Sequence, residues 1–294
     1  MLEWVSMGRS MQSLVGIGVA VVLGGLVAWA GGSGAATAGP VSVVVLCAAI
    51  AYAINWAAFV PAYLGQTERF YDLTGTLTYL VVVAVAFVLG GGGARPVMLA
   101  TLVVVWAVRL GSFLVTRIAK DGSDGRFDSI KPKPLRFLMT WTMQGLWVTL
   151  TVGCALAAMT AERSTELDLW ALVGLVIWLL GFTFEAVADQ QKRAFRADTS
   201  NDGRFITGGL WAWSRHPNYF GEIVLWVGVA VIAVPALSGW QFVTLVSPLF
   251  VTVLLTRISG VPLLEARGRQ RWGDDAEYRD YVARTPVLVP RPPR

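Results

Sequence analysis

Long apolar runs without charged residues are the feature that most restricts how this chain can fold. Runs of about 18 or more such residues are typical of transmembrane helices. Only 15% of the 294 residues are charged, whereas soluble proteins carry about 25%. We therefore predict an all-α polytopic membrane helix bundle with seven or eight spans. The expected spans are residues 11–30, 41–63, 73–90, 97–116, 138–160, 168–188, 219–236 and 240–257.

The distribution of Lys and Arg predicts the orientation of these spans. With eight spans and the N-terminus in the cytoplasm, the outer loops hold only Arg95 and Arg163. The other basic residues fall almost entirely in inner loops and in the tail from Arg257, and only Arg109 lies well inside a span. Positive residues favour the cytoplasmic side. We expect both termini in the cytoplasm, as in a multi-pass protein of a bacterial plasma membrane, and one membrane domain over residues 1–294.

Several classes of ligand are disfavoured by composition. The two cysteines, Cys47 and Cys154, lie inside apolar runs, and His216 is the only histidine. With so few ligands of the usual spacing, we predict no metal site. The net charge of +5 suits anionic lipid or an anionic ligand. The sequence has no basic stripe with interleaved aromatic residues outside the membrane-flanking loops, so nucleic acid is not an expected ligand.

The segment from Asp189 to Glu222 carries the most chemically capable side chains. If the sixth span continues as a helix, one face presents Glu185, Asp189, Lys192 and Arg196. Carboxylates at a membrane boundary are costly unless they have partners. A charged, solvated helix end is the alternative interpretation.

The string SRHPNYFGE, from Ser214 to Glu222, begins the seventh span. Pro217 suits the first turn of a helix, and Ser214 can supply a capping oxygen. Capping does not explain the remaining polar residues of this string. Asn218 and Glu222 share a helix face, and the backbone N–H groups of a helix start favour an anion such as phosphate.

These motifs, with the spacing of Asp189 and Arg196 and the ending WGDDAEYRDYVARTPVLVP, resemble the C-terminal domain of the steroid 5α-reductase superfamily. The resemblance covers about residues 100–290 and is closest to a bacterial branch of unknown function. A shorter version of the pattern is similar to the isoprenylcysteine carboxyl methyltransferases. The resemblance divides the chain into N-terminal helices at residues 1–96 and a reductase-like region at residues 97–294 with cytosolic loops.

The resemblance implies that NADPH binds from the cytosolic side. The residues that it points to as cofactor contacts, by motif position, are Asp189, Arg196, Asn218, Tyr219 and Glu222. The adjacent candidates are Arg204, Arg215 and His216. Arg offers planar, bidentate donors to the phosphates, and carboxylates or Asn can hold ribose hydroxyls or the nicotinamide carboxamide. The tail residues Arg257, Glu265, Trp272, Tyr278 and Tyr281 can close the site, with Glu265 as a further candidate cofactor contact, or they can form an amphipathic surface helix.

Two further patches lie in the first half of the chain. One is a basic cluster with Arg109, Arg117, Asp121 and Arg126, which the resemblance implies as candidate contacts because the reductases place a comparable cluster near the cofactor phosphates. The other, residues 66–72, contains Glu68 and Asp72, the candidates for an acid that polarises a substrate carbonyl. It can also be an ordinary loop. The reductases place a Tyr where this chain has Trp106.

The function that we predict from these residues is NADPH-dependent reduction of an activated C=C bond in a lipophilic substrate, either steroid-like or an isoprenoid or lipid enone. The substrate would enter from membrane lipid. A membrane methyltransferase that uses S-adenosylmethionine is the first alternative. A non-enzymatic transporter is the second, but transporters often contain repeats, and we find no repeat in the sequence.

Overall fold

The structure of the protein is a computed structural model, and it describes residues 2–121, 124–125, 127–163 and 166–293. Within these residues, eight helices are long and apolar enough to cross a membrane. They cover residues 10–31, 43–64, 71–89, 94–116, 134–160, 169–197, 217–236 and 239–272. The prediction of a polytopic helical bundle is therefore confirmed. Each predicted span overlaps one of these helices.

The chain divides into two compact units, and each is described by itself. The first contains residues 1–168 and 233–247, and the second contains residues 169–232 and 248–294. The prediction of one membrane domain, with regions 1–96 and 97–294, remains a prediction.

The first unit is built from five long helices and a short hairpin. These elements are α1 (Leu2–Gly31), β1 (Thr37–Ala38), β2 (Val41–Ser42), α2 (Val43–Leu64), α3 (Tyr71–Leu89), α4 (Ala94–Asp121) and α5 (Pro134–Thr160). The hairpin pairs Thr37 with Ser42 and Ala38 with Val41. Two 3₁₀ turns, Val234–Ala236 and Gly239–Leu245, also belong to this unit.

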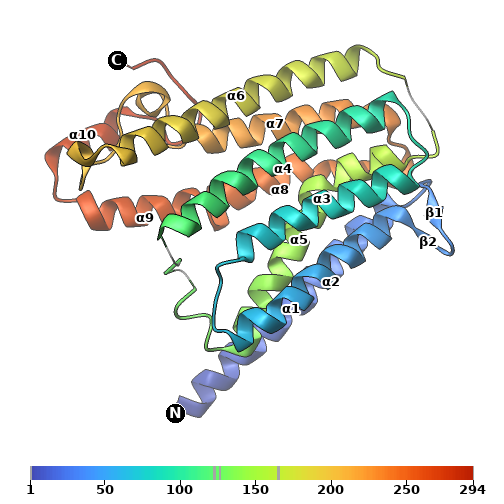
Figure 1. Ribbon diagram of the computed structural model, residues 1–294, viewed down its shortest axis with the longest axis horizontal. Coiled ribbons are helices and arrows are strands. Elements are labelled where there is room, and N and C mark those ends of the chain that lie inside the picture. The colour runs from blue at the N-terminus through green and yellow to red at the C-terminus, as the bar shows by residue number, and fades with distance from the viewer. Residues whose placement is uncertain (1, 122–123, 126, 164–165, 294) are drawn as a thin grey trace. The chain divides into compact units, whose positions relative to one another are not determined.

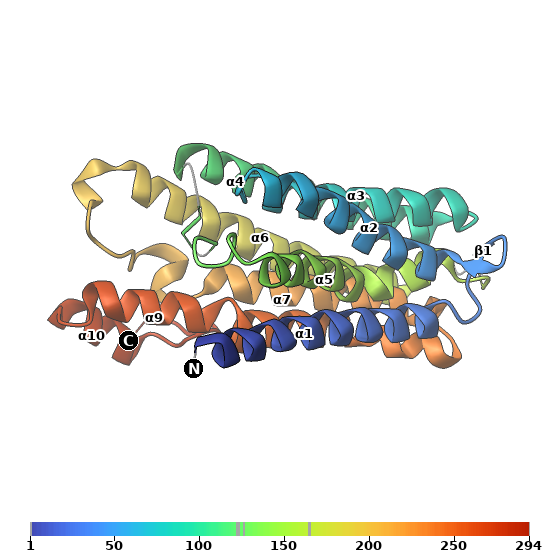
Figure 2. The same cartoon turned by 90° about the horizontal axis from the view of Figure 1, so that it is seen from below.

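Helix α5 forms the core of the first unit. It packs against α1, α2, α3 and α4, and 89% of its most apolar window is buried, against 28–39% for those four helices. Helix α3 lies beside α2 and α4 in both ribbon views (Figures 1 and 2). The outward faces of the outer helices carry exposed large apolar side chains such as Leu26, Val60 and Val88. Such faces suit contact with lipid.

The second unit combines two long helices with the loops that follow them and the tail. It holds α6 (Leu169–Ala197), a 3₁₀ turn (Thr199–Asn201), a second 3₁₀ turn (Gly209–Ala212), α7 (Pro217–Ala233), most of α8 (Val246–Val253), a π-helical turn (Leu254–Ile258), α9 (Val261–Trp272) and α10 (Ala276–Arg284). Helix α6 runs nine residues beyond the predicted end at residue 188.

Glycines let α6 and α7 approach closely, as the ribbon shows (Figure 1). Gly174 and Gly181 on α6 face Gly228 and Gly221 on α7, seven residues apart on each helix. A Cβ added at Gly181 would lie 2.4 Å from the Leu225 nitrogen. Because small residues allow backbones to meet in this way, α6 and α7 hold their polar residues in fixed register.

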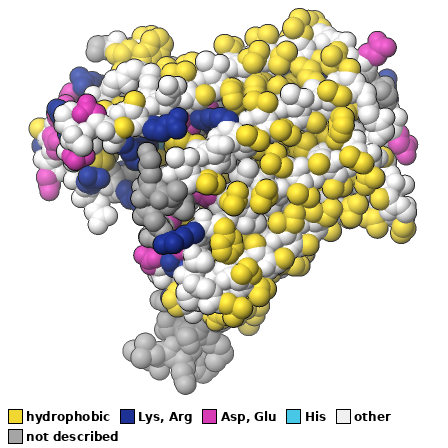
Figure 3. All heavy atoms as spheres, in the orientation of Figure 1, with side chains coloured by type: hydrophobic (Ala, Val, Ile, Leu, Met, Phe, Trp, Pro, Cys, Tyr) yellow, Lys and Arg dark blue, Asp and Glu magenta, His cyan; other side chains and the backbone are white. Residues whose placement is uncertain are grey.

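Charged side chains of the second unit gather at one end. In the space-filling view, many Lys, Arg, Asp and Glu side chains gather toward the end that carries α9 and α10, a few others lie lower down and at the opposite edge, and hydrophobic side chains cover most of the remaining surface (Figure 3). This charged end is where the candidate site lies.

Candidate functional site

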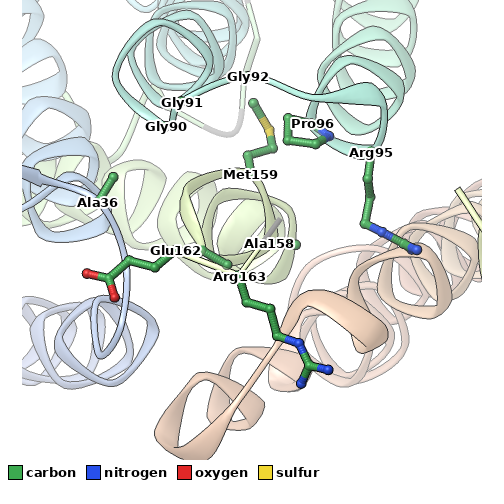
Figure 4. A pocket seen from close by; sticks show the side chains of 11 residues that line it. Ala36, Gly90, Gly91, Gly92, Arg95, Pro96, Ala158, Met159, Glu162 and Arg163 are labelled. Carbon is green, nitrogen blue, oxygen red and sulfur yellow. The ribbon is translucent and has the colours of Figure 1, made fainter. Parts of the chain in front are cut away.

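A cavity of about 300 Å³ lies in the first unit, and it is less suitable as a ligand-binding site than the cavity of the second unit. It is lined by Gly90, Gly91, Gly92, Arg95, Glu162 and Arg163, among others. In Figure 4, Glu162 extends away from Arg95 and Arg163. The buried Arg95 guanidinium is held by Asp168 at 3.0 Å and by the Glu166 carbonyl at 2.7 Å. Its contacts are therefore those of a structural ion pair.

A cavity of about 280 Å³ lies wholly within the second unit. Its wall combines basic side chains with aromatic rings. The six basic residues are Lys192, Arg196, Arg204, Arg215, Arg267 and Arg271. The aromatic residues are Phe195, Phe205, Trp211, Trp272, Tyr278 and Tyr281. His216 and Glu265 also line it. Such a wall offers charge-assisted hydrogen bonds to an anion and flat surfaces to a ring.

Glu265 is the centre of the polar contacts in this cavity. Its carboxylate accepts a hydrogen bond from Arg215 Nη1 at 3.1 Å and lies 3.0 Å from His216 Nε2. Because an ionised carboxylate only accepts, His216 Nε2–H is the donor. Helix α9 is thereby joined to the turn before α7.

Burial lowers the pKa of His216, although the hydrogen bond to Glu265 acts in the opposite direction. The imidazole is therefore neutral near pH 7, with its hydrogen on Nε2. Nδ1 is then an acceptor, and it is buried without a hydrogen-bond partner in the protein. The Tyr219 ring stacks on the imidazole with centroids 5.6 Å apart. Gly260, directly after the π-helical turn, leaves the space that the Tyr219 ring needs.

Aromatic residues hold the loop after α6 against the tail. Phe205 contacts the rings of Trp272, Tyr278 and Tyr281 at centroid distances of 5.1–5.8 Å. Trp272 Nε1 donates to the Gly203 carbonyl. Burial raises the pKa of Tyr281 far above its usual value, so its hydroxyl keeps its proton and donates to the Trp211 carbonyl at 2.8 Å.

The predicted face of α6 divides into a buried part and a cavity part. Glu185 and Asp189 are buried, and Lys192 and Arg196 line the cavity. Asn218 Nδ2 donates to Asp189 Oδ1 at 3.1 Å. Glu222, one turn further along α7, is also buried. Asp189 and Asn218 thus meet in the α6–α7 interface, where Gly221 of α7 also lies against the backbone of Glu185.

The structure gathers many of the predicted cofactor contacts in one unit. Arg196, Arg204, Arg215, His216 and Glu265 line the cavity. Asp189, Asn218, Tyr219 and Glu222 lie on α6 and α7 and do not line it. Arg257, in the π-helical turn, is exposed and does not line it either.

The other predicted site residues belong to the first unit. Arg109 lies on α4, half-buried. The side chains of Arg117 and Asp121 and the whole of Arg126 fall outside the described residues. Asp72 lies in the first turn of α3.

Glu68 forms a buried ion pair. Its Oε2 is 2.6 Å from Lys131 Nζ, and its Oε1 accepts from the Asp124 N–H at 2.7 Å. Burial acts to raise the pKa of Glu68, but these hydrogen bonds outweigh it and lower the pKa. The carboxylate therefore stays ionised and ties the 124–131 loop to residue 68. Its role as a catalytic acid remains a prediction.

Sequence reasoning missed part of the cavity wall. Arg267 and Arg271 lie four residues apart, on the face of α9 that also carries Leu264 and Gly268. Helical spacing from Leu264, which places Arg267 at i+3 and Arg271 at i+7 on the same face, was a signal that could have found them. Trp211 is a further residue of this wall, and its indole N–H donates to the Ala188 carbonyl at 3.1 Å and fixes the loop to α6.

Eight apolar helices among the described residues and a basic, aromatic cavity in the second unit define a multi-pass membrane protein with an anion-suited site. The chain belongs to the family described as protein of unknown function DUF1295, whose sequence model matches residues 58–285. This family is part of the steroid 5α-reductase superfamily, which confirms the resemblance stated above.

Curated relatives match parts of the chain. The 3-oxo-5-alpha-steroid 4-dehydrogenase 1 of Rattus norvegicus is 29% identical over 120 residues, 40% of each chain. An uncharacterized protein of Schizosaccharomyces pombe is 28% identical over 178 residues, covering 50% of this chain and 51% of its own. A probable O-methyltransferase of Ustilaginoidea virens is 28% identical over 82 residues, covering 28% of this chain and 29% of its own. The chain thus spans about half or less of these relatives. No solved structure matches it.

Proposed function

We propose that this protein is an NADPH-dependent reductase of an activated C=C bond in a lipophilic substrate. The observation that carries the proposal is the cavity of the second unit, with six basic residues and six aromatic residues in its wall. The similarity to a steroid 4-dehydrogenase over 120 residues supports the reaction class. The membrane spans support a lipophilic substrate that arrives from the bilayer.

The basic residues would hold the cofactor phosphates. NADPH carries a pyrophosphate and a 2′-phosphate, and a 2′-phosphate needs a cationic partner such as Arg. Arg204, Arg267 and Arg271 come from two different segments of the cavity wall, so they can surround two separate anionic groups. Aromatic rings beside these cations suit the adenine ring, as stacking and cation–π contacts are favourable there. Arg271 already lies over the Trp272 ring, 4.9 Å from its centroid.

The neutral and acidic residues would fix the rest of the cofactor. Glu265 accepts from Arg215 and His216 and has further lone pairs for ribose hydroxyls. The acceptor His216 Nδ1 suits a hydroxyl or an amide N–H. The Asn218 Oδ1 atom is likewise buried without a partner in the protein, and it suits the amide group of a carboxamide. These two buried acceptor atoms, His216 Nδ1 and Asn218 Oδ1, therefore suit a ligand that offers several hydrogen-bond donors.

Bound NADPH would supply a hydride to the β-carbon of the substrate. The chain's own part is then to orient the cofactor and to polarise the conjugated carbonyl. Asp72 and Glu68 remain the proposed candidates for the polarising acid, and Glu68 could act in this way only with its carboxyl protonated and released from Lys131. Trp106 stands where the related reductases have Tyr, which argues for a substrate other than a steroid or for a different way of polarising the carbonyl.

A methyltransferase is the second candidate function. The similarity to a probable O-methyltransferase over 82 residues favours it. S-adenosylmethionine carries no phosphate, however, so it would leave most of the basic wall without an anionic partner. The number of Lys and Arg side chains therefore favours NADPH.

Calorimetric titration of the detergent-solubilised protein with NADPH, NADH and S-adenosylmethionine tests this proposal. We expect NADPH to bind at least about tenfold more tightly than NADH, a difference of roughly 1.4 kcal/mol. Binding of S-adenosylmethionine without binding of NADPH would overturn the reductase in favour of the methyltransferase.

Helix α9 offers a matched set of variants for the same titration. Arg267→Ala and Arg271→Ala remove cations that line the cavity, whereas Arg269→Ala removes an exposed cation of the same helix that does not line it. At least one of the first two should reduce the preference for NADPH over NADH. Arg269→Ala should preserve that preference. If all three substitutions changed the preference for NADPH over NADH equally, Arg267 and Arg271 would not be the residues that hold the 2′-phosphate.

A further inference from the structure

The turn that carries Arg215 and His216 is held by the C-terminal tail through backbone hydrogen bonds. The Arg215 N–H donates to the Pro286 carbonyl at 2.9 Å, and the Arg291 N–H donates to the Trp213 carbonyl at 2.9 Å. Residues 286–291 therefore run alongside residues 213–215. We call residues 286–291 the tail clamp.

Ser214 joins the tail clamp to the start of α7. Its side chain is completely buried. The hydroxyl donates to the Leu288 carbonyl at 2.8 Å, and its oxygen accepts from the His216 N–H at 3.1 Å. One side chain thus satisfies a tail carbonyl and one of the N–H groups that a helix start leaves unpaired. No other hydroxyl in the described part of this turn makes both contacts.

This arrangement fixes the direction of two cavity side chains. Arg215 and His216 both reach Glu265 from this turn. A shift of the turn would misalign the guanidinium and the imidazole, because hydrogen bonds weaken steeply with poor geometry. The tail clamp itself adds no charged side chain to the cavity wall.

We propose that Ser214 is a positioning residue for the nucleotide site, and that it acts by coupling the tail clamp to the Arg215–His216 turn. The inference rests on the proposed function for its ligand, NADPH. The coupling between Ser214 and the tail is independent of that ligand, so the two can be tested separately.

The first experiment compares Ser214→Ala with Ser214→Thr, which keeps a hydroxyl. Hydrogen exchange measured by mass spectrometry without nucleotide should show faster exchange in both 213–217 and 286–291 for Ser214→Ala. NADPH affinity should fall roughly two- to tenfold, as expected for one neutral hydrogen bond, while the unfolding midpoint stays within a few degrees. Ser214→Thr should restore both readouts.

The second experiment removes a clamp bond from the tail side. Arg291→Pro deletes the N–H that donates to Trp213, whereas Arg291→Ala keeps it. We expect Arg291→Pro to speed exchange at 213–217 and to weaken NADPH binding, with Arg291→Ala close to the wild type. This pair tests the clamp even where Ser214→Thr does not fold.

The outcomes separate the two proposals. If the wild-type protein does not bind NADPH but Ser214→Ala speeds exchange in both segments, the proposed function fails and the clamp stands. Unchanged exchange in 286–291 with unchanged NADPH affinity overturns the positioning role. A large loss of the unfolding midpoint together with lost binding also overturns it, because Ser214 would then support the fold in general.

Discussion

Gly221 on α7 lies directly against the backbone of Glu185 on α6: a Cβ at Gly221 would be 2.5 Å from the Glu185 nitrogen and 2.6 Å from the Gly181 carbonyl oxygen. Both of these neighbours are backbone atoms, which cannot rotate away as a side chain can. The contact lies one turn from Asp189 and next to Glu222. The spacing of α6 and α7 at this level therefore decides whether the polar residues of the interface can meet.

Gly221→Ala should push α6 and α7 apart and separate Asn218 from Asp189. Overpacking of this kind costs about 1–3 kcal/mol, so we expect a lower unfolding midpoint and weaker NADPH binding. Differential scanning fluorimetry in detergent and calorimetry measure the two effects. Gly208→Ala is the control, because a Cβ there meets nothing within 4 Å. A Gly221→Ala protein with wild-type values would show that the helices tolerate the extra methyl group.

Asn218 and Glu222 should contribute to nucleotide affinity rather than to folding alone. Glu222→Gln and Asn218→Ala are each expected to weaken NADPH binding by about 1.5–3 kcal/mol, the cost of losing a hydrogen bond to a charged group. This corresponds to roughly tenfold to a hundredfold in Kd. Both variants should be extracted in detergent like the wild type. Wild-type NADPH affinity in both folded variants would remove these residues from the site.

His216 should make the protein less stable in acid. Its folded-state pKa lies below the ordinary 6.5 because of burial, so the unfolded chain binds a proton more readily than the folded one. The stabilising effect of the neutral imidazole is fully present above about pH 6.5 and is lost as the pH falls through the lowered pKa. Unfolding midpoints from about pH 8 to about pH 5 should fall more steeply for the wild type than for His216→Gln. Parallel curves would contradict this assignment.

The Glu68–Lys131 pair should stabilise the first unit. Lys131→Ala leaves a buried carboxylate without its cation, and breaking a buried pair costs about 3–5 kcal/mol. The exposed neighbour Lys133 provides the control, and Lys133→Ala should be nearly neutral. Because the folded pKa of Glu68 is lowered below 4.5, the pair's contribution is present above about that pH and is lost as the pH falls through the lowered value. Equal unfolding midpoints for the two variants would show that the pair has no such role.

The orientation predicted from the basic residues can be tested by cysteine labelling in intact cells. Cys47 and Cys154 are buried, so an introduced exposed cysteine should dominate the signal. A membrane-impermeant maleimide should label Glu162→Cys, in a predicted outer loop, and should label Ser129→Cys only after the membrane is permeabilised. The reverse pattern would place the candidate site on the outer face.

The spans could be predicted from the sequence because length and absence of charge are local properties. The end of α6 could not, since its last turns are charged and hydropathy gives no boundary for a helix of this composition. Arg204, Arg215 and Glu265 were found through motifs, and Arg267 and Arg271 were missed because their meeting with Arg204 depends on how α9 packs. The hydroxyl of Ser214 donates to the backbone carbonyl of Leu288, 74 residues away. Every residue has a backbone carbonyl, so the sequence cannot indicate which one is the acceptor.

The tail clamp also bears on how the protein should be handled in the laboratory. Its bonds to the Arg215–His216 turn end at Arg291. An affinity tag or fluorescent protein fused close behind Arg291 would pull on the segment that holds the turn in place. Purification tags are therefore better placed at the N-terminus, and a weak activity measured with a C-terminal tag should be repeated after the tag has been removed.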